Sequence, residues 1–219
     1  CVGIGLNSLE LLFGGVVATI ASLLCAKWFR CEEHLVSSGI YGYNAALVGV
    51  ATFYFFNSGP LTSGIAILGG IFSAWLLHCM RVKFPRVPPL TASFVVTTWL
   101  IFFIADLLGY AAPGPRPNPA PLGDFYAIVT GVGQVVFQGY WLTGLVFVFA
   151  LALSSFTVAI WAVAGSALGF VTARALAFPE ESILIGVYGF NACLAAIVLS
   201  QRYSRTLWPI LIGIVLSTV

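Results

Sequence analysis

Long apolar runs, broken by short polar clusters, extend along the whole of this 219-residue chain. A run of about 20 mostly apolar residues can cross a bilayer as a helix. The pattern predicts such helices at eight places: 8–27, 35–56, 61–80, 90–109, 139–153, 155–173, 182–200 and 206–219. The join near Ser154–Ser155 is weakly marked, because residues 139–173 are too long for one span and short for two.

Residues 125–137 are also apolar, but they are too short to cross. Irregular backbone at membrane depth persists only where it is buried in protein or lines a wet cavity. We therefore expect a re-entrant segment here and regard it as a candidate pore element.

The two halves of the chain match at a constant offset of 147 residues. The sequence GIYGYNAAL at 39–47 recurs as GVYGFNACL at 186–194. This match indicates an internal duplication. Five predicted spans separate equivalent points, and an odd number means that the second half crosses the bilayer in the opposite direction.

The pattern predicts a first repeat at 1–112, a Pro-rich linker at 113–124 and a second repeat at 125–219. The stretch from Pro113 to Pro121 is typical of an extended, polyproline-like connection, although a plain external loop is an equal alternative. Counterparts of Gln134 and of the turn 88–91 fall outside the 219 residues. Each repeat is therefore expected to be incomplete, the first at its start and the second at its end.

Composition narrows the class of protein. Hydrophobic residues make up 60% of the chain, charged residues 7%, and the mean hydropathy is +1.05. Soluble domains carry roughly 25% charged residues, so a soluble enzyme and a disordered protein are excluded. The net charge of +2 provides no basic surface for nucleic acid. The five cysteines form no CxxC pair and read as small apolar side chains.

The few basic residues predict the orientation. One side of the expected membrane collects seven of them, and Arg116 and Arg174 fall on the other. Because positive loops favour the cytoplasm, we expect an integral protein of a plasma or inner membrane with the loops at Lys27, Arg81 and Arg202 cytoplasmic.

The polar groups expected at mid-membrane are neutral. The predicted spans contain no carboxylate pair, histidine cluster or arginine ladder, which argues against proton relays and ion coupling. With only two histidines and no acid–base pair, we expect no enzyme, no cofactor and no metal site. Neutral amides and hydroxyls beside aromatic rings fit a small, planar, uncharged solute instead.

At four segments, in order, the sequence resembles the urea transporter family. These are IYGYNAAL at 40–47, PPLTASF at 88–94, GQVVFQ at 133–138 and VYGFNACL at 187–194. The resemblance implies an all-α polytopic membrane protein built as an inverted-topology repeat of five-helix halves, each with a re-entrant pore helix. It further implies passive urea diffusion through a narrow, uncharged, aromatic-lined filter in a homotrimer.

The resemblance also implies which residues contact the solute. Gln134 stands at the filter position of the re-entrant motif, and its amide in an apolar segment needs partners. The other implied pore residues are Val135, Phe137, Thr91, Tyr43, Leu47, Phe190 and Leu194. Three positions depart from the family pattern: Gln134 stands where Glu is usual in the second repeat, Tyr43 where Phe is usual, and Ser93 where Pro is common.

Other roles and functions stay open at this point. Asn44 and Asn191 can satisfy broken backbone rather than touch solute, and Thr91 can cap the helix that follows Pro89. The chain could conduct another small neutral solute, such as ammonia or a short amide. It could also be a non-conducting membrane subunit.

Overall fold

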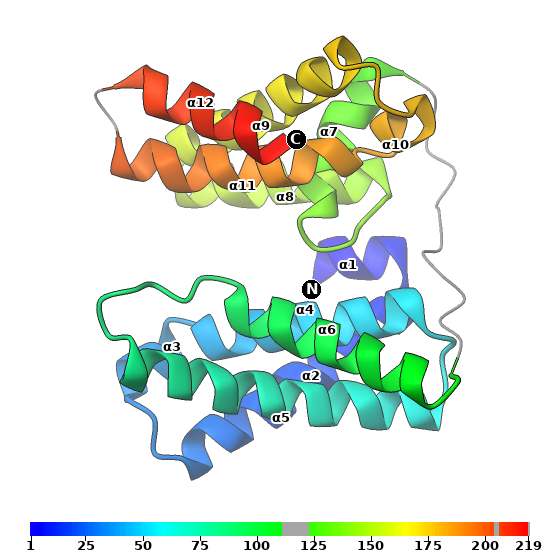
Figure 1. Cartoon of the computed structure of the whole chain (residues 1–219), viewed down its shortest axis with the longest axis vertical. Coiled ribbons are helices and arrows are strands. Elements are labelled where there is room, and N and C mark those ends of the chain that lie inside the picture. The colour runs from blue at the N-terminus through cyan, green and yellow to red at the C-terminus, as the bar shows by residue number, and fades with distance from the viewer. Residues whose placement is uncertain (111–122, 204–205, 219) are drawn as a thin grey trace. The chain divides into compact units, whose positions relative to one another are not determined.

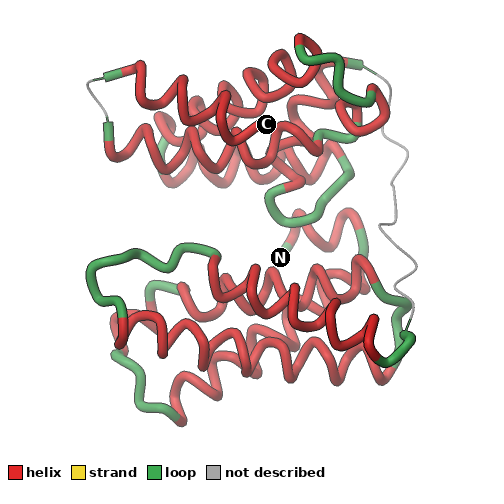
Figure 2. Tube along the Cα trace, viewed as in Figure 1, coloured by secondary structure: helices red, strands yellow, loops and turns green. Residues whose placement is uncertain are grey.

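The computed structural model describes residues 1–110, 123–203 and 206–218, and the regular structure within them is helical (Figures 1 and 2). The chain divides into two compact units. One comprises Ser8–Arg116, and the other comprises Cys1–Asn7 together with Pro117–Val219. Almost all of the linker expected at 113–124 lies outside the described residues.

In the unit Ser8–Arg116, three helices pack against one another and a fourth lies against two of them. The first three are α2 (Leu9–Trp28), α4 (Ile40–Phe55) and α5 (Pro60–Lys83), with the short α3 (Glu33–Ser37) before α4; the fourth is α6 (Ala92–Leu107). Glycines let these helices approach closely, because a Cβ on Gly49 would collide with the backbone of Gly14. A Cβ on Gly70 would lie 2.5 Å from the Ala18 carbonyl oxygen.

The other unit repeats this arrangement and adds helices before it. Its helices are α1 (Val2–Asn7), α7 (Asp124–Gln134), α8 (Trp141–Ser154), α9 (Phe156–Ala175), α10 (Glu180–Leu184), α11 (Val187–Arg202) and α12 (Leu207–Thr218). The helix α9 packs along α11, and α12 packs against both. A core of Ala192, Ala196, Ile210 and Ile214 joins α11 to α12.

The helix boundaries recur at the offset found in the sequence. The helices α2, α3 and α4 each begin and end 147 residues before α9, α10 and α11, and α5 begins 147 residues before α12. The backbone recurs as well, since Gly39 has a φ of 80° and Gly186 a φ of 79°. The duplication therefore extends to local conformation. The inverted relation of the repeats stays a prediction.

The expectation of single spans at 35–56 and 182–200 is wrong. A short helix, a left-handed glycine and a 16-residue helix replace each of them. The glycine ends one helix and begins the next, and the amide of Tyr43 donates to the Gly39 carbonyl. Sixteen residues extend about 24 Å, which is less than the ~30 Å apolar core of a bilayer.

In the part of the chain that the structure describes, three helices are long and apolar enough to cross a membrane by themselves: Leu9–Trp28, Pro60–Lys83 and Phe156–Ala175. Three shorter apolar helices are α6, α8 and α12. The join expected near Ser154–Ser155 is a real break between α8 and α9, because Ser155 is extended with φ −160° and ψ 114°.

The N-terminal helix belongs with the second half of the chain. The helix α1 packs on α8, and the hydroxyl of Thr143 donates to the Gly3 carbonyl over 2.8 Å. The contacts thus group Cys1–Asn7 with the residues after 117, although the sequence repeat begins at residue 1. The expected repeat boundaries themselves stay a prediction.

The segment expected to be re-entrant forms the short helix α7 and a turn. Its 11 residues extend about 16 Å, too short to cross a bilayer. Residues 129–133 are all buried, and α7 packs against α8, α9 and α11. The second half of the helix is therefore buried in protein, and its re-entrant placement in the membrane stays a prediction.

Candidate functional site

Gln134 is the last residue of α7, and its side chain reaches the break between α10 and α11. Its Nε2 donates a 2.9 Å hydrogen bond to the carbonyl of Ile185, the residue before the left-handed Gly186. A carbonyl oxygen can only accept, so this bond fixes which end of the amide faces Ile185. Among the described residues, no donor bonds the Gln134 Oε1. The half-buried amide thus keeps an unused acceptor.

The turn after α7 is held in a rarely populated conformation. Phe137 has a φ of 58°, and a non-glycine residue in this region costs about 1–3 kcal/mol. The fully buried Gln138 stabilises the turn: its Nε2 donates to the Val136 carbonyl at 2.8 Å, and its Oε1 accepts from Asn7 Nδ2 at 2.9 Å. The backbone N–H of Gln138 also donates to the Gly133 carbonyl. Strained backbone held this firmly is a mark of functional sites.

Close backbone contacts fix α7 against its neighbours. A Cβ on Gly186 would lie 2.5 Å from the Gly131 nitrogen, so α7 can pack this closely against Gly186 only because that residue has no side chain. The hydroxyl of Ser166 on α9 donates to the Ile128 carbonyl at 2.6 Å. At the start of α7, Arg174 contacts Asp124 at 3.1 Å and Glu180 at 2.8 Å. These ion pairs are exposed and contribute little energy. Burial and backbone fit position the helix.

Three further candidates of this unit lie on α11 and next to Gln134 in the chain. Phe190 and Leu194 are half-buried and four residues apart, and therefore share one face of α11. Val135 is partly buried against Val132, Ala162 and Cys193, so it packs in the core of this unit. The structure thus brings Gln134 to the start of α11.

In the unit Ser8–Arg116, Asn44 holds the turn that carries Thr91. Its Nδ2 donates to the carbonyls of Ile40 and Leu90 at 3.1 Å each, and its Oδ1 accepts from the Phe94 amide at 3.3 Å. Asn44 is 1% exposed. The reading of Asn44 as a residue that satisfies broken backbone is confirmed.

Thr91 stands at the N-cap of α6, but its half-buried side chain makes no capping hydrogen bond. The expected alternative of a capping hydroxyl is therefore wrong. The preceding Leu90 has a φ of 44°. The turns at Leu90 and Phe137 thus share a left-handed residue next to or near a candidate solute contact.

The other candidates of this unit differ in exposure. Tyr43 is 42% exposed, whereas Leu47, one turn further along α4, is 3% exposed. Leu47 is therefore a packed residue within this unit. Asn191, the equivalent of Asn44, is exposed, because no segment like Leu90–Phe94 lies against it within the described residues.

The two units also differ at their equivalent glycines. Gly186 is covered by α7, but a Cβ on Gly39 would meet nothing within 4 Å. Among the described residues, the α2–α4 face at Gly39 therefore lacks the cover that α7 gives to α9 and α11.

Three residues at the site were not assigned roles from the sequence: Gln138, Asn7 and Ile185. Gln138 carried a usable signal, since a buried amide in an apolar segment needs partners. Ile185 carried none, because its contribution is a backbone carbonyl. Across the described residues, no group of three or more His, Cys, Asp or Glu side chains could hold a metal ion.

Comparisons with known proteins point the same way along the whole chain. A family profile described as "Urea transporter" matches residues 1–219. Urea transporter 1 of Mus musculus and that of Rattus norvegicus are each 28% identical over 214 residues, and that of Capra hircus is 26% identical. Each match covers 89% of this chain and 55% of the relative. The chain thus spans about half the length of these relatives.

Proposed function

We propose that this chain, which belongs to the urea transporter family, forms part of a channel through which urea diffuses passively across a membrane. Its apolar helices make it an integral membrane protein. The proposal covers the solute, the mechanism and the residues that contact the solute. It requires no cofactor and no chemical step.

The Gln134 amide carries this proposal. Its Nε2 is engaged by the Ile185 carbonyl, and its Oε1 has no donor among the described residues. Urea presents N–H groups in one plane, and each needs an acceptor when it leaves water. Because the hydrogen bond to Ile185 already immobilises the Gln134 side chain, binding urea at Oε1 loses little further side-chain entropy. Gln134 is therefore suited to replace a water around the solute.

The neutrality of the proposed filter decides which solutes pass. The candidate residues Gln134, Thr91 and Tyr43 carry no formal charge, and the candidate Phe137, Phe190 and Leu194 are apolar. Moving an ion out of water costs tens of kcal/mol in a low-dielectric site, and these side chains supply no charge to offset it. A planar amide can stack on an aromatic ring and keep its hydrogen bonds. This argues for urea over ions.

Thr91 is proposed as a second polar contact. Its hydroxyl is free of the capping bond that its position would allow, and Asn44 fixes the turn that carries it through Leu90 and Phe94. Tyr43 lies next to Asn44 on α4 and is partly exposed. Val135 and Leu47 pack inside their own units. For these two we propose a supporting role at the edge of the slot.

Several features of the assembly belong to the same proposal. The repeats are inverted, the protein is a homotrimer with one pore per subunit, and the loops at Lys27, Arg81 and Arg202 face the cytoplasm of a plasma or inner membrane. The matching helix boundaries support the duplication, and the basic ends of α2 and α5 support the orientation.

Stopped-flow light scattering of proteoliposomes containing the full-length protein tests the function. Under an inward urea gradient, vesicles with protein should re-swell faster than empty vesicles, and an ion gradient should give no such difference. Equal rates for filled and empty vesicles would refute urea conduction.

The same vesicles separate urea from the alternative solutes. Methylurea and formamide should compete with urea, whereas ammonia flux should stay at the rate of empty vesicles. His34 contacts Glu32 and His78 contacts Cys31, and neither histidine is among the proposed filter residues. Ammonia flux without urea flux would favour the alternative channel, and no flux of either solute would favour a non-conducting subunit.

A further inference from the structure

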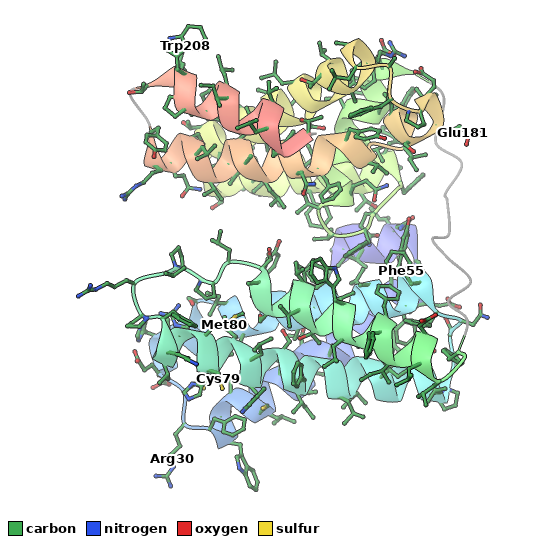
Figure 3. All side chains as sticks on the ribbon, viewed as in Figure 1. Arg30, Phe55, Cys79, Met80, Glu181 and Trp208 are labelled. Atoms are coloured by element: carbon green, nitrogen blue, oxygen red, sulfur yellow. The ribbon has the colours of Figure 1, made fainter. Side chains whose placement is uncertain are left out.

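A cationic cavity lies at one end of the unit Ser8–Arg116. Its volume is about 670 Å³, and it is formed by the turn after α2, the end of α5 and the loop before α6. Arg30, Arg81 and Arg86 line it, with Glu32 as the carboxylate among the lining residues. The lining thus carries a net charge of +2 when His78 is neutral. Figure 3 shows Arg30 projecting from the turn after α2.

An apolar groove adjoins this cavity. It lies between α2 and α5, has a volume of about 610 Å³ and is lined by Leu24, Trp28, Ile71 and Trp75 among other apolar side chains. Trp28 is 86% exposed and Trp75 is 42% exposed. Apolar side chains this exposed on a spanning helix face the hydrocarbon, and tryptophan favours the interface between hydrocarbon and water.

A single aromatic stack joins the groove to the cavity. Phe29 lines the groove and His78 lines the cavity, and their rings stack with centroids 6.2 Å apart and an interplanar angle of 7°. Along α5, the ten steps from Ile71 to Arg81 rise about 15 Å. The apolar groove therefore continues into the charged cavity along α2 and α5.

We propose that this cavity and groove bind one anionic phospholipid, with the phosphate among the arginines and an acyl chain between α2 and α5. Arginine binds phosphate oxygens through two parallel N–H donors. Basic pockets at the membrane surface attract anionic lipid headgroups. A neutral solute has no use for three arginines, so this proposal concerns a different ligand and does not depend on urea conduction.

The charge complementarity selects the lipid class. Phosphatidylglycerol carries a net negative charge and an uncharged glycerol, whereas phosphatidylcholine adds a quaternary ammonium that the arginines would repel. Each basic side chain near the surface contributes about 1 kcal/mol to anionic lipid binding, which corresponds to roughly fivefold in affinity. Two of the arginines acting together should therefore give at least a tenfold preference for phosphatidylglycerol.

Native mass spectrometry of the purified full-length protein, titrated with each lipid in detergent, tests the site. Wild type should bind one phosphatidylglycerol at least tenfold more tightly than phosphatidylcholine. The double variant Arg81→Gln/Arg86→Gln should lose this preference. The matched control Arg202→Gln, an exposed arginine at the end of α11, should keep it. Trp28→Ala should weaken the binding of both lipids. It should leave the melting temperature of the protein unchanged, because Trp28 is almost fully exposed.

The other outcomes overturn the proposal. Equal affinity for the two lipids, or an unchanged preference in the double variant, would show that the arginines do not select the headgroup. Displacement of the lipid by millimolar inorganic phosphate would show a free-phosphate site. A change in subunit number in Trp28→Ala, with no lipid bound to wild type, would show that a second copy of the chain covers the groove.

Discussion

Asn44 and Asn191 occupy equivalent positions 147 residues apart, but only Asn44 is enclosed. Asn44 exchanges three hydrogen bonds with Ile40, Leu90 and Phe94, whereas Asn191 is exposed. Equivalent residues of a duplicated fold thus have different surroundings, because the turn that covers one has no counterpart against the other in the described residues. The energetic roles of the two residues should differ accordingly.

Replacing Asn44 by alanine should lower the stability of the protein by about 1–3 kcal/mol, since it removes the buried hydrogen bonds to the Leu90 carbonyl and from the Phe94 amide. Asn191→Ala is the matched control and should change stability by less than about 0.5 kcal/mol. Melting of the detergent-solubilised protein, followed by tryptophan fluorescence, measures both. Equal destabilisation by the two variants would show that Asn44 does not clamp the turn.

The glycines that precede α4 and α11 form a second matched pair. Gly39→Ala and Gly186→Ala both place an L side chain at a φ near 80°, which costs about 1–2 kcal/mol. Only Gly186→Ala also drives a Cβ to 2.5 Å from the Gly131 nitrogen. We expect Gly186→Ala to destabilise the protein clearly more than Gly39→Ala in the same melting assay. A similar loss in both would mean that α7 does not press on Gly186.

The inverted arrangement predicts opposite sidedness for equivalent turns. Arg30 and Ala177 are 147 residues apart, follow equivalent helices and share a positive φ of 50° and 55°. In a cysteine-free background of the full-length protein, Arg30→Cys should react with an impermeant maleimide only from the cytoplasmic side. Ala177→Cys should react only from the other side. Labelling of both from one side would mean that the halves run in the same direction.

Phe137 is proposed to form an aromatic wall of the filter. Stacking on an aromatic ring contributes about 0.5–1.5 kcal/mol, or roughly two- to tenfold in rate. Phe137→Leu should slow urea flux by about that factor, and Phe137→Tyr should keep most of it. The control is Phe125→Leu, an exposed phenylalanine on α7, the helix that precedes the turn of Phe137. Equal flux in Phe137→Leu and Phe125→Leu would remove Phe137 from the filter.

The sequence predicted the helices that obey simple rules. Apolar length placed α2 and α9 to within two residues of their bounds, and the offset of 147 anticipated the matching boundaries. It did not predict the breaks before α4 and α11, because a hydropathy pattern is blind to the left-handed φ that Gly39 and Gly186 adopt. The short length of α7 was predicted, because the length of an apolar run can be read directly from the sequence.

The candidate site was predictable only in part. Gln134 stood out because an amide in an apolar segment must find a partner, but its partner is the backbone of Ile185, 51 residues away. Asn44 was foreseen as a residue that satisfies backbone, whereas the exposure of Asn191 depends on a tertiary contact that no local pattern encodes. Partners supplied by distant backbone are the part that sequence reasoning misses.

The central claim is that the Gln134 amide, oriented by Ile185, accepts a hydrogen bond from urea inside the channel. Stopped-flow urea flux of Gln134→Ala tests it most directly, beside Gln201→Ala, an exposed glutamine on α11 that bonds the Ile197 carbonyl. Gln134→Ala should conduct urea at least several-fold more slowly than wild type at equal protein density, and Gln201→Ala should conduct at the wild-type rate. Wild-type flux in both variants would contradict the account.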